Sequence, residues 1–220
     1  MSISSTTFLI TTPDFDDVVF YCSRWSDEII EEAEKKGFNV INLPKDKANR
    51  DNFEGHIRKQ KPKFVMFNGH GSPNEIGGHK NEILLEKGKN EQLMKERIIY
   101  ARSCFALKEL GEACVKCGAL GFISYALPFS FISDPNRSAH PLKDELAKPC
   151  LLTSNMIPIA IIKGQTISEA VEKAKAKMDE LIRYWETRTD LVEAQFVASC
   201  LHWNMIGLGF KGDPHTKLSV

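Results

Sequence analysis

The 220-residue sequence lacks several features that would place it in a broad functional class. No apolar stretch reaches the 18 residues that suggest a membrane-spanning helix, and the first residues have neither the basic segment nor the long apolar segment of a secretory signal. Charge of one sign is not in excess, because 29 Lys and Arg residues balance 29 Asp and Glu residues at a pI near 7.0. We therefore expect no membrane span and no nucleic-acid partner, since nucleic-acid binders usually carry a basic surplus or patch.

Cysteine is also scarce for a disulfide-stabilised protein. Six cysteines are few for a disulfide scaffold of this length, and several lie inside apolar helix or strand patterns. We expect most of them to be buried free thiols. This usage indicates a reducing, cytoplasmic setting.

The common ligand-binding motifs of α/β proteins are missing as well. The sequence contains no GxGxxG, no P-loop and no GxSxG match. Cys114 and Cys117 form a single Cys-x-x-Cys pair, but structural zinc would need two further ligands, and no clear second pair exists. We accordingly expect neither a metal nor a cofactor.

Short apolar runs that alternate with helical patterns make up most of the chain. Such alternation predicts an α/β fold with a mostly parallel sheet covered by helices on both faces, in one domain spanning residues 1–220. Asp14 is the expected N-cap of the first helix. The predicted strands cover residues 7–11, 38–43, 63–68, 98–101 and 119–125. The predicted helices cover residues 14–36, 52–59, 107–116, 139–147, 168–185 and 190–204.

Two of these predicted strands lead into a reactive side chain. The first is followed by His70 between two glycines, and the second by Cys104. Because the carboxyl ends of neighbouring parallel strands meet at one edge of a sheet, we expect both side chains there. A histidine in that position can accept the thiol proton and produce a thiolate nucleophile. Cys104 also precedes a predicted helix, whose N-terminus would stabilise the thiolate.

The residues around these two side chains resemble the motifs of a known group of enzymes. Asn68–Gly71 (NGHG) resembles the histidine motif, and Ala101–Cys104 (ARSC) the cysteine motif, of caspase-fold cysteine peptidases. The 34-residue separation of His70 and Cys104 resembles the short spacing of the gingipain and CHAT-domain branches, whereas caspases separate the pair by about 50 residues. The resemblance is close over residues 63–125 and looser elsewhere, where its landmarks are the segments GQTISEA (164–170) and GDP (212–214).

This resemblance implies a caspase-like three-layer fold and a cysteine endopeptidase that acts on protein or peptide substrates. Cys104 would be the nucleophile and His70 the general acid and base, with no carboxylate partner nominated for the histidine. The backbone N–H groups of Gly71 and Cys104 would form the oxyanion hole. Control by a regulatory protein partner is a further expectation.

Three more residues are candidate substrate contacts. In this family the residue two positions before the cysteine tends to line the specificity pocket, and here it is Arg102. An arginine there predicts a preference for Asp or Glu before the scissile bond; alternatively, Arg102 is a solvated or ion-paired residue at the strand end. The strand Gly121–Tyr125 could pair with an extended substrate, with Ser124 and Tyr125 as contacts.

Two other functions fit the same sequence. One is a non-catalytic interaction module on the caspase-like fold, a pseudo-protease. The other is a doubly wound α/β domain that binds a small molecule. A histidine placed to reach the Cys104 sulfur favours the peptidase, and a phosphate cradle at the mouth of the sheet favours the second alternative.

Overall fold

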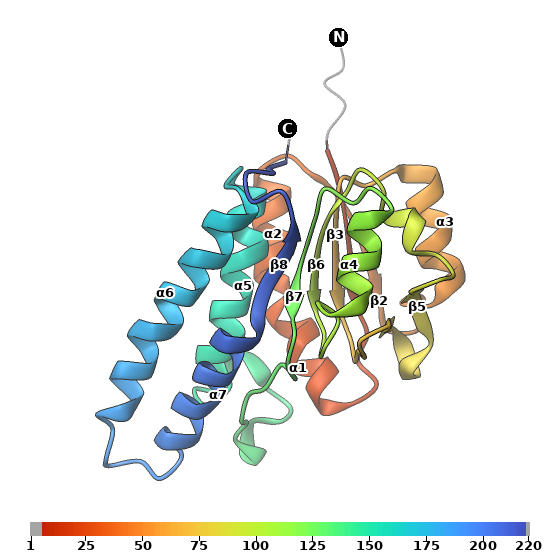
Figure 1. The fold of residues 1–220 in the computed structure, drawn as a ribbon. Coiled ribbons are helices and arrows are strands. Elements are labelled where there is room, and N and C mark those ends of the chain that lie inside the picture. The colour runs from red at the N-terminus through yellow and green to blue at the C-terminus, as the bar shows by residue number, and fades with distance from the viewer. Residues whose placement is uncertain (1–5, 219–220) are drawn as a thin grey trace.

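The computed structural model describes residues 6–218 and contains a six-stranded central sheet (Figure 1). The strand order is β2-β1-β3-β6-β7-β8, in which all neighbours are parallel except β7 and β8. The strands are β1 (Thr7–Thr12), β2 (Asn39–Pro44), β3 (Phe64–Asn68), β6 (Ile98–Arg102), β7 (Gly121–Tyr125) and β8 (Leu208–Gly212). The predicted mostly parallel sheet is therefore confirmed.

Helices cover both faces of this sheet and complete three layers. One face carries α1 (Asp17–Trp25), α2 (Asp27–Lys35), α5 (Lys148–Ile162), α6 (Ile167–Glu186) and α7 (Ala194–Gly207). The other carries α3 (Arg50–Gln60), α4 (Glu109–Lys116) and the hairpin of β4 (Glu75–Gly77) and β5 (Ile83–Glu86). Short 3-10 turns occupy Lys45–Lys47, His79–Asn81, Glu91–Met94, Pro135–Arg137 and Pro141–Lys143.

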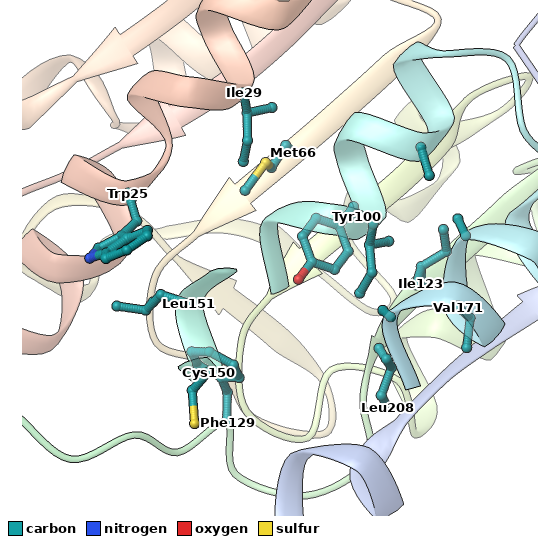
Figure 2. Packing of buried hydrophobic residues seen from close by; sticks show 14 of the residues in the cluster. Trp25, Ile29, Met66, Tyr100, Ile123, Phe129, Cys150, Leu151, Val171 and Leu208 are labelled. Atoms are coloured by element: carbon teal, nitrogen blue, oxygen red, sulfur yellow. The ribbon is translucent and has the colours of Figure 1, made fainter. Parts of the chain in front are cut away.

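The apolar runs are continuous because both faces of each central strand are buried. In β3, Phe64 and Met66 face the α1/α5 side, while Val65 and Phe67 face the α3/α4 side. Figure 2 shows the first of these clusters, in which Met66 lies among side chains from the sheet and from the covering helices. This two-sided burial makes the central strands rigid supports for the residues that follow them.

The first predicted helix differs from the observed one in two ways. It divides at Ser26 into α1 and α2, and the Ser26 hydroxyl donates to the Cys22 carbonyl at 2.9 Å. Its N-cap is Asp16 rather than Asp14, because the Asp16 Oδ1 atom accepts the Val19 N–H at 2.8 Å. The correction matters for function, since Asp16 lies just beyond β1 at the carboxyl edge of the sheet.

The predicted helix 139–147 is wrong, and the helix that follows it was not predicted. Asp144 is fully buried and its carboxylate accepts the N–H groups of Leu146 and Ala147, which competes with helical hydrogen bonds. The observed helix α5 begins at Lys148. Apolar side chains lie all around α5, so it has no amphipathic period that a sequence pattern would reveal.

The C-terminal part adds an antiparallel strand to the sheet. Residues Leu208–Gly212 pair with all five residues of β7. Leu218 is the last described residue. Among residues 6–218, no helix is long and apolar enough to cross a membrane.

Candidate active site

The structure places His70 and Cys104 at the same edge of the sheet. Asn68 and Arg102 are paired at the ends of the parallel strands β3 and β6, and each candidate follows its strand end by two residues. The Ser103 hydroxyl donates to the Gly69 carbonyl at 2.8 Å and ties the two loops together. Parallel register thus brings together two side chains that are 34 residues apart in sequence.

The two glycines around His70 are required by close backbone contacts. A Cβ atom on Gly69 would lie 2.1 Å from the Gly77 carbonyl oxygen in β4. A Cβ atom on Gly71 would lie 2.8 Å from the Cys104 carbonyl oxygen and 2.9 Å from the Ser103 Cβ atom. The histidine loop therefore packs directly on the cysteine loop, and only glycine leaves room for that contact.

A carboxylate holds the His70 imidazole. The Nε2 atom of His70 lies 2.7 Å from the Asp16 Oδ2 atom, and both side chains are partly exposed. The other Asp16 oxygen caps α1, so a helix N-terminus fixes the carboxylate in place. With Asp16 accepting from Nε2–H, the Nδ1 atom is the basic nitrogen of a neutral imidazole.

Sequence reasoning nominated no carboxylate partner and so missed Asp16. Its signal was its position in the loop after β1, because β1 ends at the same edge of the sheet as β3 and β6. Sequence reasoning considered this loop only as a helix cap. A capping aspartate uses one oxygen for the cap and has the other free to bind a second partner, which here is His70.

Cys104 is half-buried in a turn, and its surroundings act on the thiol in opposite directions. Burial raises the pKa of the thiol, whereas hydrogen bonds from the backbone N–H groups of Phe129 and of Cys104 itself lower it. The next residue, Phe105, has a left-handed φ of 61°, which turns the chain sharply after the cysteine. Helix α4 begins only at Glu109, so the expected stabilisation by a helix N-terminus is corrected to stabilisation by the Phe129 amide.

Within residues 6–218, no hydrogen bond joins the His70 imidazole to the Cys104 sulfur. The described hydrogen bonds likewise leave the N–H group of Gly71 without an acceptor and use that of Cys104 only for its own sulfur. These are the two donors that were predicted for an oxyanion hole. The Gly71 N–H group thus has no described acceptor, and the Cys104 N–H group has only its own sulfur.

Arg102 lies beneath the site rather than on its surface, with only 2% of its area exposed. Its guanidinium donates to the Ser154 hydroxyl at 2.8 Å, to the Cys22 carbonyl at 2.9 Å and to the Asn155 amide oxygen. No carboxylate of the described chain forms an ion pair with it. The alternative of a solvated or ion-paired residue at the strand end is therefore wrong, because neutral oxygens of α1 and α5 surround the charge.

Ser124 and Tyr125 are also fully buried. The Ser124 hydroxyl donates to the Ala101 carbonyl at 2.8 Å, and the Tyr125 hydroxyl lies 3.4 Å from the Ser154 Oγ atom. Burial raises the pKa of Tyr125 well above its usual value. Both edges of β7 are occupied, by β6 and by β8, so the prediction that an extended substrate adds to this strand is wrong for this conformation.

The remaining cysteines and histidines were considered as metal ligands in the sequence. Residues 6–218 contain no group of three or more His, Cys, Asp or Glu side chains arranged to hold a metal ion. Cys114 is buried in the core, and its burial raises the pKa of its thiol. Cys117, the other half of the Cys-x-x-Cys pair, caps the end of α4 and is half-buried.

Comparison with solved structures identifies the fold. The chain is similar to the crystal structure of the Arg-specific cysteine proteinase gingipain R, with a TM-score of 0.62 and 11% identity over 97% of this chain and 47% of the other. A complex of the pro- and mature domains of Porphyromonas gingivalis RgpB is similar at a TM-score of 0.61 and 9% identity, over 96% and 47%. The chain thus spans about half the length of these proteinases. No family model matches the sequence, and no curated protein matches it.

At this identity the likeness establishes the fold. The mostly parallel sheet with helices on both faces is the caspase-like arrangement of gingipain. The first of these neighbours is a cysteine proteinase. The chemistry of this chain rests on its own residues.

Proposed function

We propose that this chain is a single-domain cysteine peptidase in which Cys104 is the nucleophile and His70 the general acid and base. The observation that carries the proposal is the 2.7 Å contact of His70 with Asp16, at the sheet edge where Cys104 also lies. The carboxylate, the imidazole and the thiol follow β1, β3 and β6, which are neighbouring parallel strands of the sheet. These are the three group types that together activate a nucleophile. The caspase-like fold shared with cysteine proteinases supports the same reading.

The proposed mechanism begins with proton transfer. Asp16 accepts the Nε2–H bond of His70, which leaves the Nδ1 lone pair free to take the proton of the Cys104 thiol. Because burial raises the pKa of this thiol, it is protonated near neutral pH until the imidazole approaches it by side-chain rotation. The resulting imidazolium is stabilised by the Asp16 carboxylate.

The thiolate then attacks the carbonyl carbon of the scissile peptide bond. The negative charge that develops on the carbonyl oxygen is bound by the N–H groups of Gly71 and Cys104. The imidazolium donates its Nδ1 proton to the departing amine, and a thioester forms on Cys104. A water molecule that loses a proton to His70 hydrolyses the thioester and restores the free thiol.

Substrate preference is a separate part of the proposal. Arg102 supplies the positive charge for an acidic residue before the scissile bond, and its lack of a carboxylate partner in the described chain supports this role. A substrate carboxylate would have to replace one of its three neutral acceptors. Ser124 and Tyr125, which lie next to this arginine in the sheet, are fully buried, so they would contact a substrate only if the residues packed on them moved.

The two alternatives make different predictions for the same site. An interaction module on this fold needs no reactive thiol, so loss of Cys104 or His70 would leave its function intact. A small-molecule domain would hold its ligand at the mouth of the sheet. A cavity of about 740 Å³ between α6 and α7 is lined by residues such as Trp185 and Trp203 and by neither catalytic candidate.

A regulatory protein partner also remains a proposal. One of the similar structures is a complex of a mature proteinase domain with its pro-domain, which motivates a search for such a partner. Full activity of the lone purified chain would argue against it. The six cysteines are all free thiols in the structure, in keeping with the proposed reducing, cytoplasmic setting.

The test is hydrolysis of a fluorogenic peptide panel with each residue type before the scissile bond. We expect cleavage after Asp or Glu, and loss of cleavage in Cys104→Ala and His70→Ala. The half-buried Cys200 and His56 serve as matched controls, and their alanine variants should retain activity. Cleavage after Lys or Arg only would refute the acidic preference, and cleavage that survives both catalytic variants would refute the mechanism.

A further inference from the structure

A segment with no catalytic candidate runs beside the nucleophile. Residues 125–127 lie antiparallel to residues 105–107, and the chain then continues to Phe129, whose backbone N–H group lies beside the Cys104 thiol. The Phe129 amide also hydrogen-bonds the Cys104 thiol and lowers its pKa. The pairing consists of two N–H···O=C contacts, from Phe105 to Leu127 at 3.4 Å and from Leu107 to Tyr125 at 3.3 Å.

Helix α7 holds this segment on both sides of Phe129. The Asn204 amide oxygen accepts the Ser130 N–H at 2.9 Å, and the Asn204 amide nitrogen donates to the Ser130 carbonyl at 2.7 Å. The Trp203 indole N–H donates to the Pro128 carbonyl at 3.0 Å. The two neighbours of Phe129 are therefore each bound by a side chain of α7.

Asn204 is fully buried, and its two bonds satisfy both backbone groups of one residue. The stretch 127–134 has no helix or strand of its own, so its backbone position depends on contacts of this kind. Displacement of Phe129 would remove a donor from the Cys104 sulfur, while the burial that disfavours the thiolate would remain.

We propose that Asn204 is a positioning residue for the nucleophile, which holds the Phe129 amide against the Cys104 sulfur through its paired hydrogen bonds to Ser130. Trp203 assists through Pro128. This inference deepens the proposed peptidase function and rests on Cys104 being its nucleophile. It links α7, which carries none of the proposed catalytic groups, to the reactivity of the thiol.

The experiment measures how fast iodoacetamide alkylates Cys104 as a function of pH, with the Cys104 peptide followed by mass spectrometry. Asn204→Ala is compared with Asn90→Ala. Asn90 is a matched control, because it is buried and also binds backbone on two sides, accepting from Glu86 N–H at 2.8 Å and donating to the Leu84 carbonyl at 2.8 Å. Its hydrogen bonds stabilise the β5 turn rather than the segment beside Cys104.

We expect the midpoint of the alkylation profile to rise by about one pH unit in Asn204→Ala, the order of effect of one N–H donor on an ionised acceptor. Trp203→Phe, which keeps an aromatic side chain but removes the indole N–H donor, should shift it less in the same direction. Asn90→Ala should leave the midpoint unchanged. Since Trp203 is partly exposed, this second variant still tests the proposal if Asn204→Ala does not fold.

The inference is overturned if the alkylation midpoint of Asn204→Ala equals that of the wild type, or if Asn90→Ala raises the midpoint equally. If Asn204→Ala does not fold, an unchanged midpoint in Trp203→Phe overturns the inference. The same comparison in a His70→Ala background separates this result from the proposed function. If His70→Ala leaves the alkylation rate of Cys104 unchanged, His70 does not activate the thiol and the proposed function fails. The effect of Asn204→Ala on the thiol can still be measured in the His70→Ala background. A rise that persists without His70 supports direct positioning of the sulfur.

Discussion

Asp16 gives the sharpest test of the proposed chemistry, because its two oxygens do different work. One oxygen caps α1 through the Val19 N–H, and the other binds the His70 Nε2 atom at 2.7 Å. Asparagine is as good a helix cap as aspartate. Asp16→Asn should therefore preserve the cap while it removes the charge that stabilises an imidazolium.

The expected loss follows from the strength of one charge-assisted hydrogen bond. Such a bond is worth about 1.5–3 kcal/mol, which corresponds to a fall in kcat/KM of about 10- to 100-fold. An asparagine amide would also donate to Nε2 and force the proton onto Nδ1, which is the nitrogen required as base. Thermal stability should change little, whereas Asp16→Ala should lose roughly 1 kcal/mol as well, since it removes the cap.

The assay is hydrolysis of the best peptide from the panel, with thermal unfolding measured in parallel. Asp17→Asn is the matched control, because Asp17 is exposed in the first turn of the same helix and has no described contact with His70. Equal activity of Asp16→Asn and the wild type would refute the role of the carboxylate. So would an equal loss in Asp17→Asn, since the effect would then come from net charge near the site.

Three further predictions follow from other contacts. Gly71→Ala should abolish cleavage and lower the free energy of unfolding by about 1–3 kcal/mol, because its Cβ atom would clash with the Cys104 backbone. Gly55→Ala is the control, since a Cβ atom there meets open space on α3. Thermal unfolding should show that this control stabilises the protein by up to about 1 kcal/mol. Arg102→Met should remove any acidic preference from the peptide panel, and an unchanged preference would exclude Arg102 from substrate recognition. Burial raises the pKa of the Cys22 thiol to about 11 from a usual value of 9.0. Between these values the unfolded chain loses the thiol proton more easily than the folded protein does. The stability contributed by the neutral buried thiol is therefore fully present below pH 9 and is lost as the pH rises towards 11. Denaturant unfolding at pH 8 and 10 should show this loss, and Cys22→Ala should reduce the difference between the two pH values.

The parallel strands of the central sheet and the two loops at its edge could be predicted from sequence alone. Continuous apolar runs such as Phe64–Phe67 indicate strands buried on both faces, and their alternation with helices requires a parallel arrangement. Parallel neighbours end at one edge, which was enough to place His70 and Cys104 together. The strong amphipathic stripe likewise predicted α6 (observed at Ile167–Glu186).

The surroundings of His70 and Cys104 depend on contacts between distant segments and could not be predicted. Asp16, Asn204 and Phe129 lie 54, 134 and 59 residues from His70 in sequence, and no local pattern signals a contact made across such distances. Helix α5 was missed because burial on every side removes the amphipathic period from which helices are predicted. The occupied edge of β7 depends on β8, a short strand that returns from the far end of the chain. Local propensity and periodicity thus fix which segments form strands and helices, while the partners of a buried charge, thiol or strand edge are set by packing between distant segments.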